Sequence, residues 1–164
     1  MDPIIIYIMG VSGSGKTTIG KKLSERIALP FFDADDFHNT GNKEKMKAGI
    51  PLTDDDRAGW LTTLNQLAKE QMRKKGAIIA CSALKEKYRK VLSDEITVAV
   101  YWIFLEGSYE LLLERMQSRK EHFMPTGLLA SQLRDLEIPE QCIVIEISNS
   151  PGKIVETILS RISE

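Results

Sequence analysis

The chain has 164 residues, of which 43% are hydrophobic, and it carries a formal net charge of −1 at pH 7. This length and apolar content favour a single domain over residues 1–164 with a sizeable core. A net charge near zero argues against a nucleic-acid-binding protein, because recognition of a phosphate backbone usually requires a basic face. No signal-peptide pattern and no apolar stretch of membrane-spanning length occur, so we expect a cytoplasmic protein without a membrane partner.

A short, nearly unbroken apolar run at residues 4–9 predicts a central parallel strand that is covered on both faces. Directly after it, residues 10–17 read Gly-Val-Ser-Gly-Ser-Gly-Lys-Thr, a complete G-x-x-x-x-G-K-[ST] phosphate-binding loop. Ile19, Leu23 and Ile27 recur every four residues, so a helix should begin near Lys16 and direct its positive end at the loop. This order of elements disfavours the alternative of a chance glycine-rich turn. The residues expected to bind the nucleotide phosphates are Gly10, Ser12, Gly13, Ser14, Gly15, Lys16, Thr17 and Thr18.

Apolar runs and helical patterns alternate after the loop, which predicts βαβ units, a parallel sheet and helices on both of its faces. Thr53 begins a capping-box pattern for a long helix, and Ser150 followed by Pro151 begins a C-terminal helix. Cys81 and Cys142 lie far apart in apolar stretches and without a C-x-x-C motif, so we expect buried free thiols. The expected strands are residues 4–9, 31–33, 77–81, 97–105 and 142–147.

Carboxylates follow the second expected strand, in the stretch from Asp33 to His38. Ligands of open α/β sheets sit beyond the carboxyl ends of the strands, so these side chains should lie near the phosphate-binding loop. Asp33 could hold a water of a Mg²⁺ shell, with the Thr17 hydroxyl as a direct ligand, while Asp35 could accept a hydrogen bond from the hydroxyl that attacks a γ-phosphate. The alternative is an acidic cap on the following turn, and Asp36 is expected to be structural. His38 is either a substrate contact or a structural hydrogen-bonding group.

Cations and a hydroxyl follow at places where a substrate could reach them. Arg57 could hold a substrate carboxylate in a bidentate pair, or it could be a solvated arginine on a helix face. Ser82 and Lys85 follow the third strand and could contact the substrate, whereas the alternative is a helix cap with a solvated basic face. Residues 54–56 are interpreted as helix-start residues that the helix dipole favours.

Residues 119–136 have weaker periodicity and contain a proline and a glycine, and we interpret them as a mobile lid. Arg115 and Arg119 lie four residues apart on one helix face, so they could clamp a triphosphate when the lid closes. An ordinary charged surface helix is the alternative. Residues 149–151, including Pro151, could line the adenine edge, although their simplest role is to cap the last helix.

In order and spacing, these motifs resemble the gluconokinase family of ATP-dependent D-gluconate kinases. The resemblance covers nearly the whole chain, and only the phosphate-binding loop is generic. The stretches that carry it are residues 10–17, 32–38, 45–46 with Gly49, 51–52, 54–57, 60–61, 81–85, 88–89, 122–125, 128–129, 131–132 and 136–137.

The resemblance implies an α/β fold of the P-loop, nucleoside-monophosphate-kinase-like type, with about five parallel strands and a lid. It also implies transfer of the γ-phosphoryl group of ATP to the terminal hydroxyl of gluconate, Mg²⁺ dependence and a homodimer. Lys16, Asp35 and Arg119 are then the expected catalytic residues. The expected acceptor contacts are Asp35, His38, Arg57, Ser82, Lys85 and His122.

One departure from the family pattern lies directly after His38, where Asn39-Thr40-Gly41 stands in place of the usual proline and predicts a looser turn. A shikimate-type kinase and a nucleoside monophosphate kinase are the alternatives on the same scaffold. The turn at residues 82–85 lacks the glycines that a shikimate kinase should show there. A non-catalytic nucleotide-binding module is a further alternative, but the chain has no Asn-Lys-x-Asp guanine-reading motif.

Overall fold

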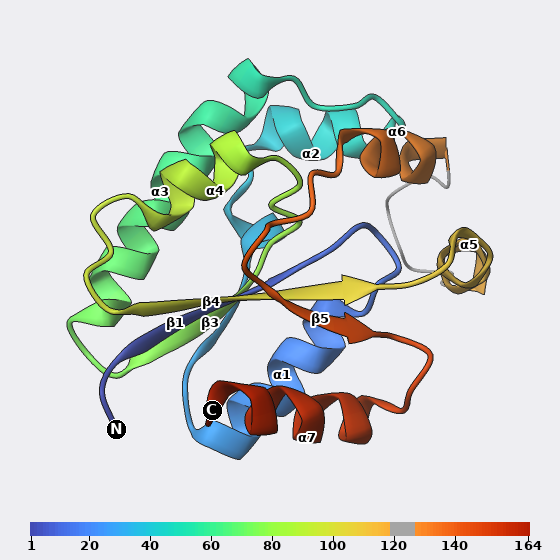
Figure 1. Cartoon of the computed structure of the whole chain (residues 1–164). Helices are drawn as coiled ribbons and strands as arrows, with labels where there is room; N and C mark the ends of the chain where they lie inside the picture. Colours follow the sequence, from blue (N-terminus) through green and yellow to red (C-terminus); the bar gives the residue numbers. More distant parts are fainter. Residues whose placement is uncertain (119–126) are drawn as a thin grey trace.

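The computed structural model describes residues 1–118 and 127–164 (Figure 1). In this part of the chain, one parallel sheet has the strand order β2-β3-β1-β4-β5. All five strands lie within two residues of the predicted bounds, so the predicted α/β fold is confirmed. The strands are β1 (Ile4–Met9), β2 (Phe31–Asp33), β3 (Gly76–Ala80), β4 (Ala99–Glu106) and β5 (Ile143–Glu146).

Helices cover both faces of the sheet, with α1 and α7 on one side and α3 and α4 on the other (Figure 1). The two faces are visible in β1, where Ile4, Ile6 and Ile8 pack with α1 and α7, while Tyr7 and its odd-numbered neighbours pack with α3 and α4. All six residues of β1 are buried, as a central parallel strand requires. The helices are α1 (Lys16–Ile27), the 3₁₀ helix η1 (Ala34–Phe37), α2 (Thr40–Lys47), α3 (Asp54–Met72), α4 (Glu86–Ser93), α5 (Tyr109–Ser118), α6 (Gly127–Asp135) and α7 (Pro151–Ile162).

Side-chain caps fix the starts of α2, α3 and α7. Thr53 and Asp56 form the predicted capping box of α3, and Ser150 caps α7 with Pro151 at its first position. The looser turn predicted after His38 is wrong, because the Asn39 side chain accepts a hydrogen bond from the Asn42 amide at 2.7 Å and caps α2. Asparagine therefore starts a helix here without a proline.

The segment interpreted as a lid divides into two parts. Residues 127–135 form α6, in which Leu128 and Leu129 are buried. Residues 119–126 lie outside the described residues, and so do the expected contacts Arg119 and His122. The lid itself stays a prediction.

The cysteines and the charges bear on the expectations from composition. Cys81 and Cys142 are both free, but only Cys81 is buried. Cys142 is half-buried because it precedes β5, which lies at the edge of the sheet, so its predicted burial is wrong.

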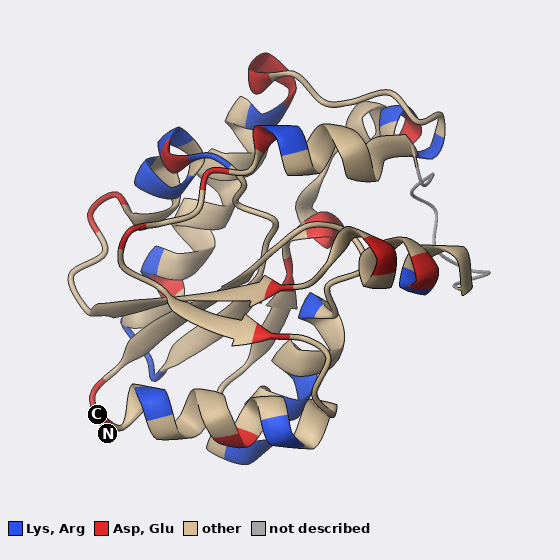
Figure 2. Cartoon of the chain, turned by 45° about the vertical axis from the view of Figure 1, so that its right-hand side comes forward, with Lys and Arg blue, Asp and Glu red and all other residues tan. Residues whose placement is uncertain are grey.

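Figure 2 shows Lys and Arg interspersed with Asp and Glu on the helices. Among residues 1–118 and 127–164, no helix combines the length and apolarity that a bilayer span requires.

Candidate active site

The phosphate-binding loop joins β1 to α1 and is shaped by glycines with positive φ. Gly13 has φ of 83° and Gly15, which precedes the first turn of α1, has φ of 94°. A Cβ atom on Gly13 would lie 2.9 Å from the Leu112 carbonyl oxygen, so glycine is also required by the close approach of α5. The Lys16 ammonium donates to the carbonyl oxygens of Gly10 and Val11 at 3.0 and 3.1 Å, which places it inside the loop.

Thr17 and Asp33 come together below the loop, from the start of α1 and the end of β2. The Thr17 hydroxyl donates to Asp33 Oδ2 at 2.9 Å, and both residues line one pocket. Hydroxyl and carboxylate oxygens are the ligands that Mg²⁺ prefers, and Mg²⁺ is usually held by one or two such groups together with substrate phosphates and water. In the described part of the chain, no cluster of three or more His, Cys, Asp or Glu residues forms an all-protein metal cage. This pair therefore fits a Mg²⁺ ion that arrives with a nucleotide.

Asp35 stands in the pocket at the start of η1, where Asp33 Oδ1 accepts a hydrogen bond from its backbone amide at 3.0 Å. About half of the Asp35 side chain, 51%, is exposed, so its carboxyl group is only partly removed from water. This partial loss of water raises the pKa of Asp35, and the negative charge of Asp33 raises it further. The nearby Lys16 ammonium acts in the opposite direction. The site thus holds a carboxyl group with an increased affinity for protons.

His38 lies beside Asp35 and is buried, with 7% of its surface exposed. Its Nε2 atom is 4.0 Å from Asp35 Oδ1, and its ring stacks on Trp60 with a centroid distance of 4.1 Å. Burial lowers the pKa of His38 to about 4, and the charges of Arg57 and Lys43 lower it in the same direction. The imidazole is therefore neutral at pH 7, and its contact with Asp35 is not an ion pair.

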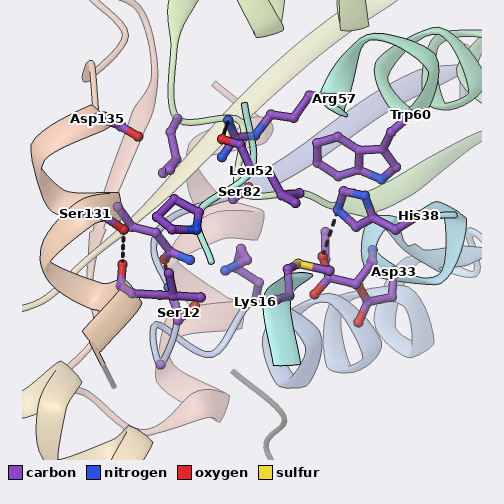
Figure 3. A pocket seen from close by; sticks show the side chains of 18 of the residues that line it. Ser12, Lys16, Asp33, His38, Leu52, Arg57, Trp60, Ser82, Ser131 and Asp135 are labelled. Atoms are coloured by element: carbon purple, nitrogen blue, oxygen red, sulfur yellow. Dashed lines mark hydrogen bonds and ion pairs between the residues drawn. The ribbon is translucent and has the colours of Figure 1, made fainter. Parts of the chain in front are cut away.

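The pocket has a cavity volume of about 110 Å³, and it is lined by the phosphate-binding loop together with Asp35 and His38 (Figure 3). Ser131 and Asp135 approach from one side, His38 and Trp60 approach from the other, and Lys16 lies between them (Figure 3). The predicted residues that line the pocket are Ser12, Gly13, Gly15, Lys16, Thr17, Asp33, Asp35, His38, Arg57 and Ser82.

Arg57 reaches the pocket from the first turn of α3. Its Nη1 atom donates to the Leu52 carbonyl oxygen at 2.7 Å and to the Tyr88 hydroxyl at 3.0 Å. The guanidinium carbon lies 5.1 Å from the centre of the Tyr88 ring, and the Tyr88 hydroxyl in turn donates to Asp54 at 2.5 Å. These contacts hold a cation in a fixed orientation at the pocket wall.

The structure does not bring every predicted residue into this pocket. Lys85 lies at the N-cap of α4, with Nζ 3.9 Å from Asp54 Oδ1, and it lines a neighbouring surface depression. Arg115 lies beside the loop, donates to the Ile147 carbonyl oxygen at 2.8 Å and has Nη1 3.7 Å from the position of a Cβ atom on Gly15. Pro151 begins α7 beyond the end of β5. Gly10, Ser14 and Thr18 belong to the loop and the start of α1 but do not line the pocket.

Sequence reasoning missed the part of the site that α6 provides. Leu128, Ser131, Gln132 and Asp135 of this helix line the pocket. The backbone amide of Ser12 donates to Gln132 Oε1 at 2.7 Å, so α6 is bonded directly to the phosphate-binding loop. Ser131 and Gln132 belong to the motifs of the gluconokinase resemblance, which was the available signal, but nothing in the local sequence gave them a role.

A phosphate-binding loop, an adjacent hydroxyl and carboxylate, and a polar pocket facing Lys16 define the class of P-loop small-molecule kinases. The family model for shikimate kinase matches residues 12–162. The chain is 47% identical over 170 residues to a probable gluconokinase of Dictyostelium discoideum, with 96% of this chain and 85% of that protein covered. It is 44% identical over 154 residues to the thermosensitive gluconokinase of Escherichia coli (strain K12), with 91% and 82% covered.

A solved structure agrees with these relatives. The crystal structure of a gluconokinase from Sinorhizobium meliloti 1021 is 37% identical, has a TM-score of 0.87, and covers 98% of this chain and 92% of that one. The chain belongs to the gluconokinase family, and this confirms the family predicted from its motifs.

Proposed function

We propose that this protein transfers the γ-phosphoryl group of ATP to the terminal hydroxyl of D-gluconate, forming 6-phospho-D-gluconate and ADP. The observation that carries the proposal is that Asp35, His38 and Arg57 line the same pocket as Lys16 and Thr17. Membership of the gluconokinase family supports the choice of acceptor.

The acceptor half of the pocket suits a sugar acid. Arg57 presents a fixed guanidinium group that can pair with the carboxylate of gluconate. Asp35 can accept a hydrogen bond from the attacking hydroxyl, and its raised pKa makes it a better proton acceptor than an ordinary aspartate. Ser82 and the α6 residues Ser131 and Asp135 provide further polar groups for the remaining hydroxyls.

The donor half positions the phosphates and neutralises their charge. Phosphoryl transfer proceeds through a loose transition state, so orientation and charge stabilisation contribute more than a strong base. The loop amides and Lys16 would hold the β- and γ-phosphates, and Arg115 beside the loop would add positive charge, together with Arg119 of the expected lid. Thr17 and Asp33 would hold Mg²⁺, which when bound neutralises negative charge on the phosphate oxygens. The homodimer and the cytoplasmic location stay predictions.

The test is a coupled assay of ADP formation with purified protein, ATP and Mg²⁺, in which gluconate, shikimate and AMP are offered separately. We expect ADP formation that depends on gluconate, with at most background rates for shikimate and AMP. Turnover with shikimate or AMP and not with gluconate would contradict the proposal. ATP binding without turnover on any sugar acid would favour a non-catalytic nucleotide-binding module.

A further inference from the structure

Two helices hold the imidazole of His38 at its face and at one edge. Trp60 of α3 stacks on the face, with an angle of 15° between the ring planes, and the Trp60 indole donates to the Ala34 carbonyl oxygen at 2.7 Å. Asn42 of α2 contacts the edge, with its Nδ2 atom 3.2 Å from His38 Nδ1. Asn42 is itself buried, with 4% of its surface exposed. The opposite edge of the ring, with Nε2, faces Asp35.

The orientation of the Asn42 amide follows from its second contact. Asn42 Nδ2 lies 2.8 Å from the backbone carbonyl oxygen of Asp56, an atom that can only accept a hydrogen bond. The amide nitrogen and not the amide oxygen must therefore face this carbonyl group. The same nitrogen has a second hydrogen to donate, and His38 Nδ1 is the atom within its reach. Since Nδ1 accepts, a neutral His38 carries its proton on Nε2.

The carbonyl group that orients Asn42 is fixed in its turn. Asp56 closes the capping box with Thr53 at the start of α3, and its carboxylate also accepts from Lys45 of α2 at 2.9 Å. The buried amide is thus held between two helices that the contact of Lys45 with Asp56 ties together. A rotation of the Asn42 amide would place two oxygens against each other at the Asp56 carbonyl group.

We propose that Asn42 is a positioning residue, which holds His38 in the Nε2–H tautomer. The imidazole can then donate a hydrogen bond to an oxygen of the bound sugar acid beside Asp35. Only the hydrogen bond from His38 to the sugar acid rests on the proposed kinase function. Asp35 would then accept from the attacking hydroxyl while His38 donates to an oxygen next to it, so the two side chains have complementary roles. With its proton on Nδ1, His38 would present an unprotonated Nε2 beside the Asp35 carboxylate. Both groups would then accept hydrogen bonds, and neither could donate one to a substrate oxygen.

Nitrogen NMR of the full chain labelled at histidine reads the tautomer without any substrate. The sequence has two histidines, so the His122→Gln variant assigns the His38 signals. We expect the Nε2 resonance of His38 in the range of protonated ring nitrogens and the Nδ1 resonance in the range of unprotonated ones. A protonated Nδ1 in the wild-type protein at neutral pH would overturn the proposal.

Asn42→Asp tests the cause, because a carboxylate can only accept from Nδ1 and should hold the proton of the neutral ring there, which leaves Nε2 without a hydrogen to donate. Negative charge is favourable near a helix N-terminus, but one carboxylate oxygen would face the Asp56 carbonyl oxygen, so urea denaturation first checks that the variant is folded. We expect kcat with gluconate to fall roughly tenfold to hundredfold, the effect of one misplaced hydrogen bond, with the KM for ATP unchanged. An unchanged tautomer or an unchanged kcat in this variant would overturn the role of Asn42.

Asn39→Asp is the matched control, because it adds the same charge to the same helix at an exposed position and keeps a side chain that can cap α2. It should leave both the His38 tautomer and kcat unchanged. If Asn39→Asp lowers kcat as strongly as Asn42→Asp, the effect is one of charge and the proposal is overturned. A failure of the proposed kinase function would be recognised separately. In that case the wild-type protein would form no ADP with gluconate, whichever tautomer His38 adopts.

Discussion

Asp35 and His38 are both pushed toward their neutral forms by the pocket that contains them. Partial burial raises the pKa of the carboxyl group and lowers that of the imidazole, so the pair does not behave as a buried salt bridge. The carboxylate of Asp35 can instead accept a hydrogen bond from one hydroxyl of the sugar acid, while the neutral imidazole of His38 donates a hydrogen bond to another oxygen of the same molecule. These hydrogen-bonding roles require His38 to be uncharged. The protonation of His38 is therefore the first property of the site to measure.

Replacement of Asp35 by asparagine tests the role of its carboxylate. Asp35→Asn keeps the size of the side chain but removes its ability to take a proton, so kcat should fall by roughly two to four orders of magnitude with a near-normal KM for ATP. Asp36→Asn is the control, because Asp36 is exposed in the same 3₁₀ helix and does not line the pocket. Steady-state kinetics with gluconate measure both variants, and unchanged turnover in Asp35→Asn would remove this residue from the mechanism.

The stability of the protein should decrease in mild acid because of His38. Its pKa is about 4 in the folded protein and 6.5 as a free side chain, so the unfolded state binds more protons between these values. The free energy of unfolding therefore falls as the pH drops from about 6.5 to about 4, by about 3 kcal/mol for this group at 1.36 kcal/mol per pKa unit.

Urea denaturation at several pH values, with wild type and His38→Gln compared, isolates this contribution. The variant cannot ionise at position 38, so its stability should decline less over the same pH range. Parallel decline of the two proteins would show that the His38 imidazole is not held neutral by the fold.

The secondary-structure elements differ in how far their own sequences define them. The segment from β1 to α1 was predicted with its bounds, because an unbroken apolar run, a glycine loop and a four-residue repeat are all local signals. The caps of α3 and α7 were predicted for the same reason. Helix α6 was interpreted only as part of a lid, because its burial against the rest of the fold and its bond from Gln132 to the loop depend on partners distant in sequence.

Single site residues follow the same rule. Asp33 ends β2, while Asp35 and Arg57 stand in the first turns of η1 and α3, so topology alone brings them to the pocket. Lys85 follows β3 in the same way but does not line the pocket, because its ammonium group lies 3.9 Å from Asp54 Oδ1 and 5.8 Å from the centre of the Tyr88 ring. Asn42 has no local signal at all, since its partners are a ring four residues away and a carbonyl group fourteen residues away.

Two glycines give opposite predictions for stability. Gly76 begins β3 with φ of 104°, and a Cβ atom there would lie 1.8 Å from the Ile4 carbonyl oxygen, so Gly76→Ala should cost about 3 kcal/mol or more. Gly59 lies inside α3 with no atom within 4 Å of a new Cβ, so Gly59→Ala should increase stability by about 0.5–1 kcal/mol. Thermal or urea unfolding of both variants measures the difference, and a stable Gly76→Ala protein would contradict the register of β1 with β3.

The proposed sites for the phosphate donor and for the phosphate acceptor lie at one edge of the sheet. The strand order reverses at β1, with β3 on one side and β4 on the other, and the phosphate-binding loop leaves the sheet at this point. The acceptor residues follow β2 and β3 or stand on α3 and α6, so the pocket lies where the elements from both halves of the chain meet. This arrangement is consistent with a kinase of small molecules, and Asp35, His38 and Arg57 are the residues that we propose to bind the hydroxylated acid.

Phosphorus NMR of the product, formed from ATP and D-gluconate by the wild-type protein with Mg²⁺, shows directly which hydroxyl receives the phosphoryl group. We expect one new phosphomonoester signal that is coupled to the two protons of a terminal CH₂ group, together with an equal amount of ADP. The Asp35→Asn protein should form this product only at a strongly reduced rate. A phosphate on a secondary hydroxyl, or ADP accompanied by inorganic phosphate alone, would contradict the placement of the acceptor in this pocket.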